Sequence, residues 1–196
     1  MQLYKVLCLS SVLAVTAQAQ EYDPARFFMS LGYSVGGDTL ATAQYTNGTS
    51  GSVRAGSGAL LQAGADIRLN RYWALQGSVG FQQDSQTATN GSISFTRYPI
   101  EALAFFYPRD RFRIGAGVQK VVGATLGGSG VGNIGTVDFD STLGTVVECE
   151  FLSRHRRHGQ FGLSLRYVAE NFTANSLPGA PTVNGDHFGF GMNWYF

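Results

Sequence analysis

The last ten residues of the chain, His187 to Phe196, alternate between large apolar and small or polar side chains. One set comprises Phe188, Phe190, Met192, Trp194 and Phe196, and the other comprises Gly189, Gly191, Asn193 and Tyr195. A period of two predicts a β-strand whose two faces meet different surroundings. An aromatic face at the edge of a soluble sheet would promote aggregation. In a closed barrel embedded in lipid, the same face contacts hydrocarbon and the edge is paired, so this segment predicts a transmembrane β-barrel.

The same alternation occurs in seven further segments. They are residues 27–36, 59–69, 73–82, 92–106, 112–122, 138–151 and 161–171. The connections between them are alternately long and short, as in bacterial barrels with long extracellular loops, short periplasmic turns and both termini in the periplasm. Tilted strands of roughly 9–11 residues span the hydrocarbon. We therefore predict an all-β fold, an eight-stranded antiparallel up-and-down transmembrane β-barrel. Pro99 interrupts one segment and predicts a bulge there, because proline cannot donate to a strand ladder.

Residues 1–19 have the organisation of a secretory signal peptide. Lys5 supplies the positive charge, residues 6–15 form the apolar region, and Ala17 and Ala19 form an A-x-A cleavage site. The apolar run is shorter than the ~20 residues of a spanning helix. We expect residues 20–196 to form one barrel domain in the outer membrane of a Gram-negative cell.

The composition agrees with this location. The chain has 26 glycines, 13% aromatic residues and only 14% charged residues, with a formal net charge of +1. Glycine and aromatic residues in short alternating segments are typical of membrane barrels, whereas the near-neutral charge argues against a nucleic-acid partner. After cleavage only Cys149 remains, which excludes an intramolecular disulfide. We expect a monomer in contact with outer-membrane lipids.

In each predicted strand, every second residue is small or polar, and these inward-facing positions include charged residues of both signs. The lumen is predicted to hold Asp66, Arg68, Arg97, Glu101, Arg113, Asp140, Glu148, Glu150, Arg166 and Glu170. Eight strands enclose a space that side chains fill, and buried charges must pair because isolated ones are very costly. The balance of signs favours a closed, salt-bridged lumen. A switchable gate that passes ions or small solutes is the alternative.

Three stretches resemble the small outer-membrane barrels of the OmpA-like and OmpX-like type. They are Arg97-Tyr98-Pro99-Ile100-Glu101-Ala102, Arg113-Ile114-Gly115-Ala116-Gly117 and the terminal segment. The resemblance implies residence in the outer membrane and a role in envelope integrity, surface adhesion or slow passage of small solutes. The spacing Gly191-x-x-Trp194-x-Phe196 is similar to the C-terminal β-signal of such proteins, which implies recognition by the barrel-assembly machinery.

Candidates for chemistry are few. His187 follows Asp186 near Ser176, and a lipid-modifying enzyme would need such groups within hydrogen-bond reach of one another. No His-x-Ser pair lies on a predicted strand, so we expect no enzyme. His155 and His158 lack further ligands at metal-site spacing, and we expect no metal or cofactor.

The predicted short turns are basic, with Arg71, Arg109, Arg111, Arg154, Arg156 and Arg157. They form either a solvated rim or a surface attracted to anionic phospholipid head groups. The long loops are rich in Thr, Ser, Asn and Gly, which allows an extracellular ligand without identifying one.

Overall fold

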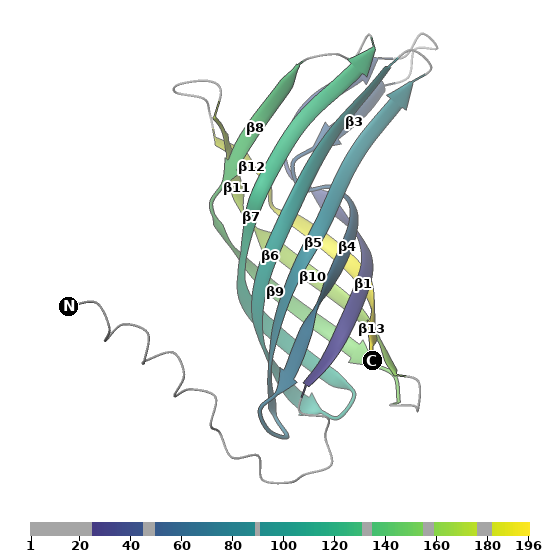
Figure 1. Ribbon diagram of the computed structural model, residues 1–196, viewed down its shortest axis with the longest axis vertical. Coiled ribbons are helices and arrows are strands. Elements are labelled where there is room, and N and C mark those ends of the chain that lie inside the picture. The colour runs from purple at the N-terminus through teal and green to yellow at the C-terminus, as the bar shows by residue number, and fades with distance from the viewer. Residues whose placement is uncertain (1–24, 45–49, 89–90, 131–134, 155–158, 176–181) are drawn as a thin grey trace, which may run out of the picture.

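Eight antiparallel strands close into a ring in the computed structural model, which describes residues 25–44, 50–88, 91–130, 135–154, 159–175 and 182–196 (Figure 1). The strands of the ring are β1 (Ala25–Gly36), β4 (Gly58–Arg68), β5 (Trp73–Ala88), β6 (Gly91–Arg109), β7 (Phe112–Gly130), β9 (Leu143–Leu152), β10 (Gln160–Ala169) and β13 (His187–Tyr195). The first and last strands pair with each other, and β7 pairs with β9, so the ring has no open edge. The predicted fold is confirmed. Among the described residues, no helix is long and apolar enough to cross a membrane.

The wall of the ring has the predicted polarity. Outward-facing Phe27, Leu163 and Phe188 are about two-thirds exposed, at 65%, 65% and 66%, whereas Phe28 and Arg113 on the other parity are 2% and 0% exposed. Since lipid covers the outside, these aromatic and aliphatic side chains lie in a favourable solvent. The register also shifts between Arg97 and Pro99, where β7 carries one more residue than β6, as the proline predicted.

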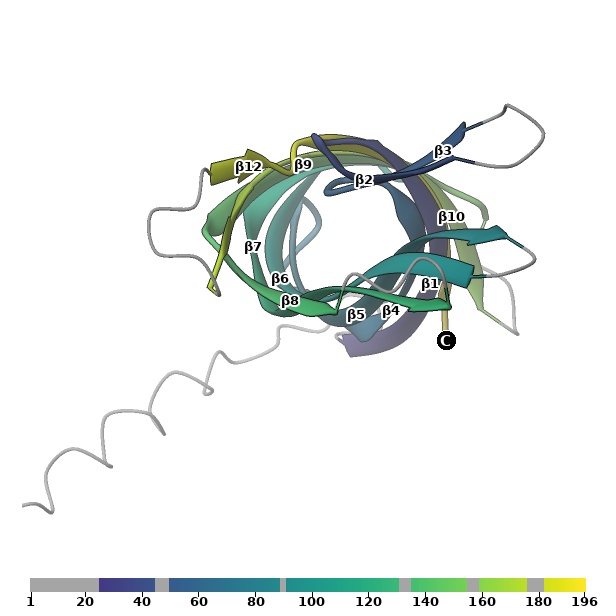
Figure 2. The same ribbon diagram turned by 90° about the horizontal axis from the view of Figure 1, so that it is seen from above.

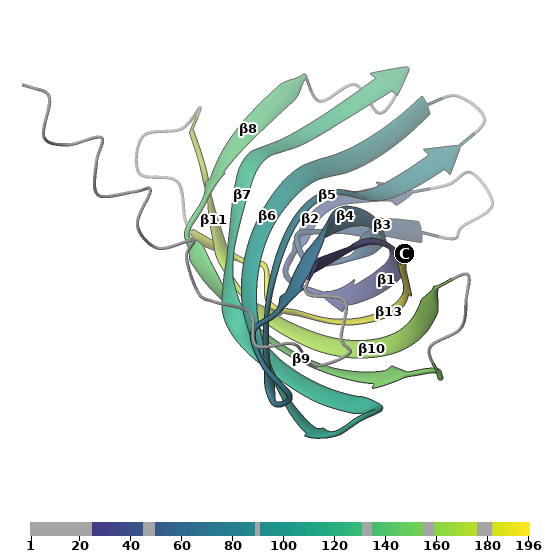
Figure 3. The same ribbon diagram turned by 60° about the horizontal axis from the view of Figure 1, so that its bottom comes forward.

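The predicted loops at residues 83–91 and 123–137 are largely strand. β5, β6 and β7 continue past the ring, and β8 (Thr136–Ser141), β11 (Asn171–Ala174) and β12 (Thr182–Asn184) join them in a raised wall at the extracellular end (Figures 1 and 3). The wall encloses an apolar cluster in which Phe95 contacts Phe139 and Phe172 edge to face, with ring centroids 5.6 and 5.7 Å apart. In this extension water replaces lipid outside, so polar residues face outward and apolar residues face inward.

The change of surroundings explains one wrong prediction. Asp140 was expected in the lumen, as part of a single strand over residues 138–151. The structure has two strands there, β8 and β9, and both Thr142 and Leu143 are exposed, which shifts the alternation by one residue. Asp140 is therefore exposed, and Phe139 and Ser141 are buried in its place.

A short hairpin of β2 (Thr39–Gln44) and β3 (Ser50–Arg54) connects β1 to β4 along the chain and lies at the rim of the extracellular end (Figure 2). The chain leaves the wall at Gly37, where φ is +75° and a Cβ atom would lie 2.3 Å from the backbone nitrogen of Gly56. Only glycine allows this close crossing of the two legs. The hairpin and the residue after it place Val53 and Ala55, which are 1% and 0% exposed, in the apolar cluster with Phe95.

Candidate functional site

The lower part of the lumen is organised around Arg113, which is fully buried. All five of its N–H groups donate to side chains, namely those of Asp66, Gln76, Tyr107, Glu150 and Tyr195. The two carboxylates are close, with Nη1 2.7 Å from Asp66 Oδ1 and Nε 2.5 Å from Glu150 Oε2. The guanidinium also lies 3.8 Å from the ring centroid of Phe105. A guanidinium with every donor used is the arrangement in which a buried cation is best compensated.

A residue that the sequence analysis missed completes this lower group. Arg26 Nε lies 2.8 Å from Asp66 Oδ2, and its guanidinium lies 4.2 Å from the ring centroid of Tyr195. Arg26 precedes the predicted first strand by one residue, but it has the lumen-facing parity of Phe28. Extending the alternation to the start of β1 would have found it.

The middle of the lumen holds Arg166, whose two carboxylate neighbours are engaged unequally. Nη2 lies 2.5 Å from Glu101 Oε1, whereas Nη1 lies 3.9 Å from Glu148 Oε2 and donates instead to Gln62 Oε1 at 3.1 Å. Beside Glu148 is a small, partly open cavity of about 10 Å³, lined by Gln62, Glu148 and Arg166 among others. That volume approaches what one water molecule needs, so side chains occupy most of the space around this group.

The upper group pairs Arg97 with Glu170. Arg97 Nη1 lies 2.9 Å from Glu170 Oε1, and Gln119 Nε2 donates to the other carboxylate oxygen at 2.9 Å. Arg97 Nη2 donates to the carbonyl oxygen of Ser57 at 3.2 Å. The ring of Phe95 lies 5.5 Å above the guanidinium carbon, so the apolar cluster of the extension directly adjoins this pair.

Eight of the ten predicted lumen residues therefore lie in three groups along the barrel, namely Asp66, Arg97, Glu101, Arg113, Glu148, Glu150, Arg166 and Glu170. Arg68 lies at the periplasmic end instead, where β4 stops. Its Nη2 donates to the carbonyl oxygen of Arg71 at 2.9 Å, and its guanidinium lies 3.9 Å from the ring centroid of Tyr107. The lumen also contains buried apolar side chains for which the alternation predicted no function, including Phe28, Leu103 and Phe105.

The histidine candidate for catalysis is held by the backbone, and the carboxylate of Glu170 lies 3.8 Å from its Nδ1, beyond hydrogen-bond distance. His187 is buried, and its Nδ1 lies 2.8 Å from the carbonyl oxygen of Gly185. The carboxylate of Asp186 accepts hydrogen bonds from the backbone of Glu170 at 3.0 Å and from the hydroxyl of Tyr167 at 3.1 Å, so it does not orient the imidazole. Ser176, His155 and His158 lie outside the described residues, as do Arg156, Arg157, Ala17 and Ala19. No metal-binding group of His, Cys, Asp and Glu occurs within the part of the chain that the structure describes.

In the predicted assembly signal, Trp194 lies on the outer wall of β13 and Phe196 just beyond it, whereas Gly191 has the lumen-facing parity. Trp194 stacks on Phe161 of β10, with ring centroids 6.3 Å apart and planes at 12°. Phe196 is 57% exposed and exchanges backbone hydrogen bonds with Phe27. A Cβ atom on Gly191 would lie 2.9 Å from Ser164 Oγ, so the Ser164 side chain would have to move to make room for it. Recognition of these residues by the barrel-assembly machinery stays a prediction.

The fold is similar to those of several solved outer-membrane proteins. Ail, the attachment invasion locus protein of Yersinia pestis, matches with a TM-score of 0.54 and 13% identity over 88% of this chain and 97% of that chain. Neisserial surface protein A matches with a TM-score of 0.52 and 11% identity over 88% and 97%. AlkL in lipid bilayers matches with a TM-score of 0.51 and 12% identity over 92% and 94%. At these identities the likeness concerns the fold alone.

Comparison with curated protein sequences gives no match. A family model described as the outer membrane protein beta-barrel domain matches residues 6–196, which include every described strand. Together with the closed ring and its apolar outer wall, this match places the protein in the outer membrane of Gram-negative bacteria. The chain belongs to the outer membrane protein beta-barrel domain family.

Proposed function

We propose that the protein is a closed barrel that displays an extracellular surface for interaction, in an envelope-structural or adhesin-like role, and that it has no enzymatic activity. The observation that carries the proposal is the filled lumen. Three groups of paired charges lie along its length, and an apolar cluster adjoins the uppermost group. A barrel without a path for solutes must act through its surfaces.

The extension supports the same proposal. Its strands hold the extracellular end on a packed core of aromatic and aliphatic side chains, and recognition sites are commonly carried on a rigid scaffold of this kind. The exposed acidic residues there include Asp38, Asp138 and Asp140, against the exposed Arg54 and Lys120, of which Lys120 donates from Nζ to the carbonyl oxygen of Ser141. One solved relative of similar fold, Ail, binds a heparin analogue. The acidic surface of this chain favours neutral or cationic partners instead, because like charges repel.

Planar bilayers test the closed lumen. Refolded protein should give no discrete conductance steps, and Arg113→Ala should introduce them by opening the lower group. Single-channel steps from the unaltered protein would refute the closed barrel and favour a narrow channel. The loose contact of Arg166 with Glu148, at 3.9 Å, is the feature that such a channel would use.

Adherence tests the surface role. Gram-negative host cells that produce the protein should adhere to an epithelial monolayer more than cells producing no barrel, and soluble heparin should not inhibit them. Asp138→Asn with Asp140→Asn should change adherence, whereas Arg71→Gln at the periplasmic end should not. Equal adherence with and without the barrel would refute an adhesin-like role.

A further inference from the structure

The lipid-facing wall is not uniform. A groove of about 760 Å³ crosses its outer surface over β1, β4, β5 and β6. Small residues make its floor, because Ala65 of β4 pairs with Gly77 of β5 and both line the groove. Ala63 lies on the same strand as Ala65 and also faces outward. The groove is open along the wall over most of its extent, so it is a shallow trough rather than an enclosed pocket.

Bulky apolar side chains stand on both sides of this floor. Phe27 and Met29 of β1, together with Phe196, flank it on one side, and Val79 and Ile100 lie on the other. These five side chains are between 45% and 65% exposed. An apolar trough between such side chains fits a hydrocarbon chain and offers nothing to a polar ligand.

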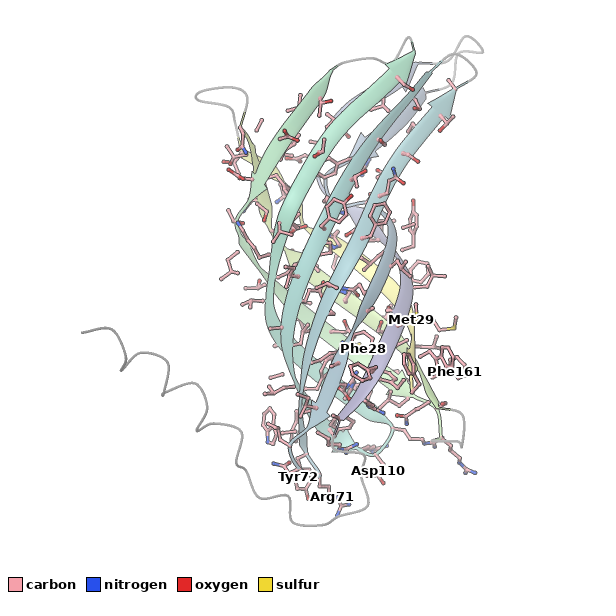
Figure 4. All side chains as sticks on the ribbon, viewed as in Figure 1. Phe28, Met29, Arg71, Tyr72, Asp110 and Phe161 are labelled. Atoms are coloured by element: carbon pink, nitrogen blue, oxygen red, sulfur yellow. The ribbon has the colours of Figure 1, made fainter. Side chains whose placement is uncertain are left out.

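The groove begins near the periplasmic end of the barrel. Phe27 follows the start of β1 by two residues, and it exchanges backbone hydrogen bonds with Phe196, the last residue. Met29 and Phe28 lie in the lower half of Figure 4, above the lower end that carries Arg71, Tyr72 and Asp110. A lipid in this groove would therefore come from the periplasmic leaflet, which consists of phospholipid.

A group of cations lies below the groove. Arg71 occupies the turn between β4 and β5, and Arg109 and Arg111 flank the turn between β6 and β7. The two turns are adjacent, because the backbone nitrogen of Tyr107 donates to the carbonyl oxygen of Tyr72 at 2.8 Å. Arg71 and Tyr72 are seen at the lower end in Figure 4, beside Asp110 of the second turn.

These three arginines outnumber the acids around them. All three are exposed, and none takes part in an ion pair with another described residue. Asp110 is the one acidic residue in the two turns, so the pair of turns carries a net charge of +2. Guanidinium groups bind phosphate through paired hydrogen bonds.

We propose that the groove and the arginines Arg71, Arg109 and Arg111 form one site for an anionic phospholipid of the periplasmic leaflet. An acyl chain lies between Phe27 and Ile100, and the head-group phosphate lies among the guanidinium groups. The apolar groove supplies retention, and the arginines supply selection for a negatively charged head group. The site is independent of whether the lumen conducts.

Native mass spectrometry of the whole protein tests the site. The protein is refolded into vesicles of equal parts phosphatidylglycerol and phosphatidylcholine and extracted in mild detergent, and the retained lipids are counted. Phosphatidylglycerol should be enriched several-fold among them, since each cation near an anionic membrane surface contributes about a fivefold factor. Retained lipids in the bulk ratio would refute the proposal.

Two sets of variants separate the two parts of the site. Replacing Arg71, Arg109 and Arg111 by Gln should abolish the enrichment, whereas Arg54→Gln, in β3 at the opposite end, should preserve it. Persistence of the enrichment in the triple variant would overturn the assignment of the head-group contacts.

Filling the groove tests the acyl contact. A Cβ atom on Gly77 would meet only the carbonyl oxygen of Glu101, at 4.0 Å, so Gly77→Leu should fold and reduce the number of lipids retained. Ala65→Leu fills the same floor from β4 if the first variant does not refold. Gly127→Leu, where a Cβ atom meets nothing within 4 Å on the extension, is the matched control. Equal retention in Gly77→Leu, Ala65→Leu and Gly127→Leu would contradict the proposal.

Discussion

Arg113 is the residue whose removal should damage the barrel most. Arg113→Met keeps a long apolar side chain but leaves the carboxylate of Glu150 buried without its cation. Asp66 keeps Arg26 at 2.8 Å, whereas the hydrogen-bond donors that Glu150 keeps among the described residues are neutral, namely Asn193 Nδ2 at 2.7 Å and the hydroxyl of Tyr195. Breaking a buried ion pair by removing one partner costs about 3–5 kcal/mol. We therefore expect the free energy of unfolding to fall by about that amount.

A double-mutant cycle distinguishes this cause from loss of packing. In Arg113→Met with Glu150→Gln, the buried charge is removed together with its partner. The amide oxygen that replaces the carboxylate still accepts a hydrogen bond, so the double variant should recover about 1–3 kcal/mol relative to Arg113→Met alone. Equilibrium unfolding in urea, followed by Trp fluorescence in lipid vesicles, measures all four proteins.

Arg54→Met, at an exposed position of the extension, is the control and should change stability by less than about 0.5 kcal/mol. If Arg113→Met cost less than about 1 kcal/mol, the lower group would not be a stabilising contact. If the double variant were as unstable as the sum of the two single variants, the pairing of Arg113 with Glu150 would not be the cause.

Three further outcomes follow from the geometry of the lumen and the extension. Glu101→Gln should lower the free energy of unfolding by about 1.5–3 kcal/mol, because Glu101 accepts a short charged hydrogen bond from Arg166. Glu148 lies 3.9 Å from Arg166 Nη1, so Glu148→Gln should lower it by less than about 1 kcal/mol in the same urea assay. Phe95→Ala should lower the stability of the extension by about 3–5 kcal/mol. Limited proteolysis should therefore cleave the extracellular end, while the ring keeps its heat-modifiable mobility on gels. An unchanged cleavage pattern would contradict this. Gly37→Ala should loosen the hairpin, because the φ of +75° at Gly37 and the 2.3 Å approach to Gly56 both exclude a side chain. The rate of hydrogen exchange at residues 50–54 should therefore rise. Unchanged protection would show that the hairpin tolerates a different backbone path.

The alternation of residue types predicted the ring but not the wall above it. Ile93 and Phe95 have the same parity as Arg97, and all three face inward in β6. The sequence marks which side chains share a face, but a single chain does not mark the height at which lipid gives way to water. Inward charges and outward apolar residues are therefore predicted along every segment, and residues 83–91 and 123–137 are predicted as loops although the strands continue through them.

The sequence could not predict which lumen charges pair with each other, for a different reason. Parity assigns Arg113 and Asp66 to the same interior, but their contact joins residues 47 positions apart on β7 and β4, which are not neighbours in the sheet. Which charges meet depends on the stagger of the strands around the closed ring. That stagger arises from all the pairings together, and no local pattern records it.

The same cross-lumen contacts connect the structure to the proposed function. Arg113 links β7 to β4, and Arg166 links β10 to β6, so each pair joins strands on separate parts of the ring in addition to the hydrogen bonds between neighbours. Widening the lumen would separate these pairs and leave buried charges uncompensated. The cross-lumen pairs thereby hold the ring at one diameter. Contacts with other molecules are then made by the two surfaces outside the lumen, which are the extracellular extension and the lipid-facing wall.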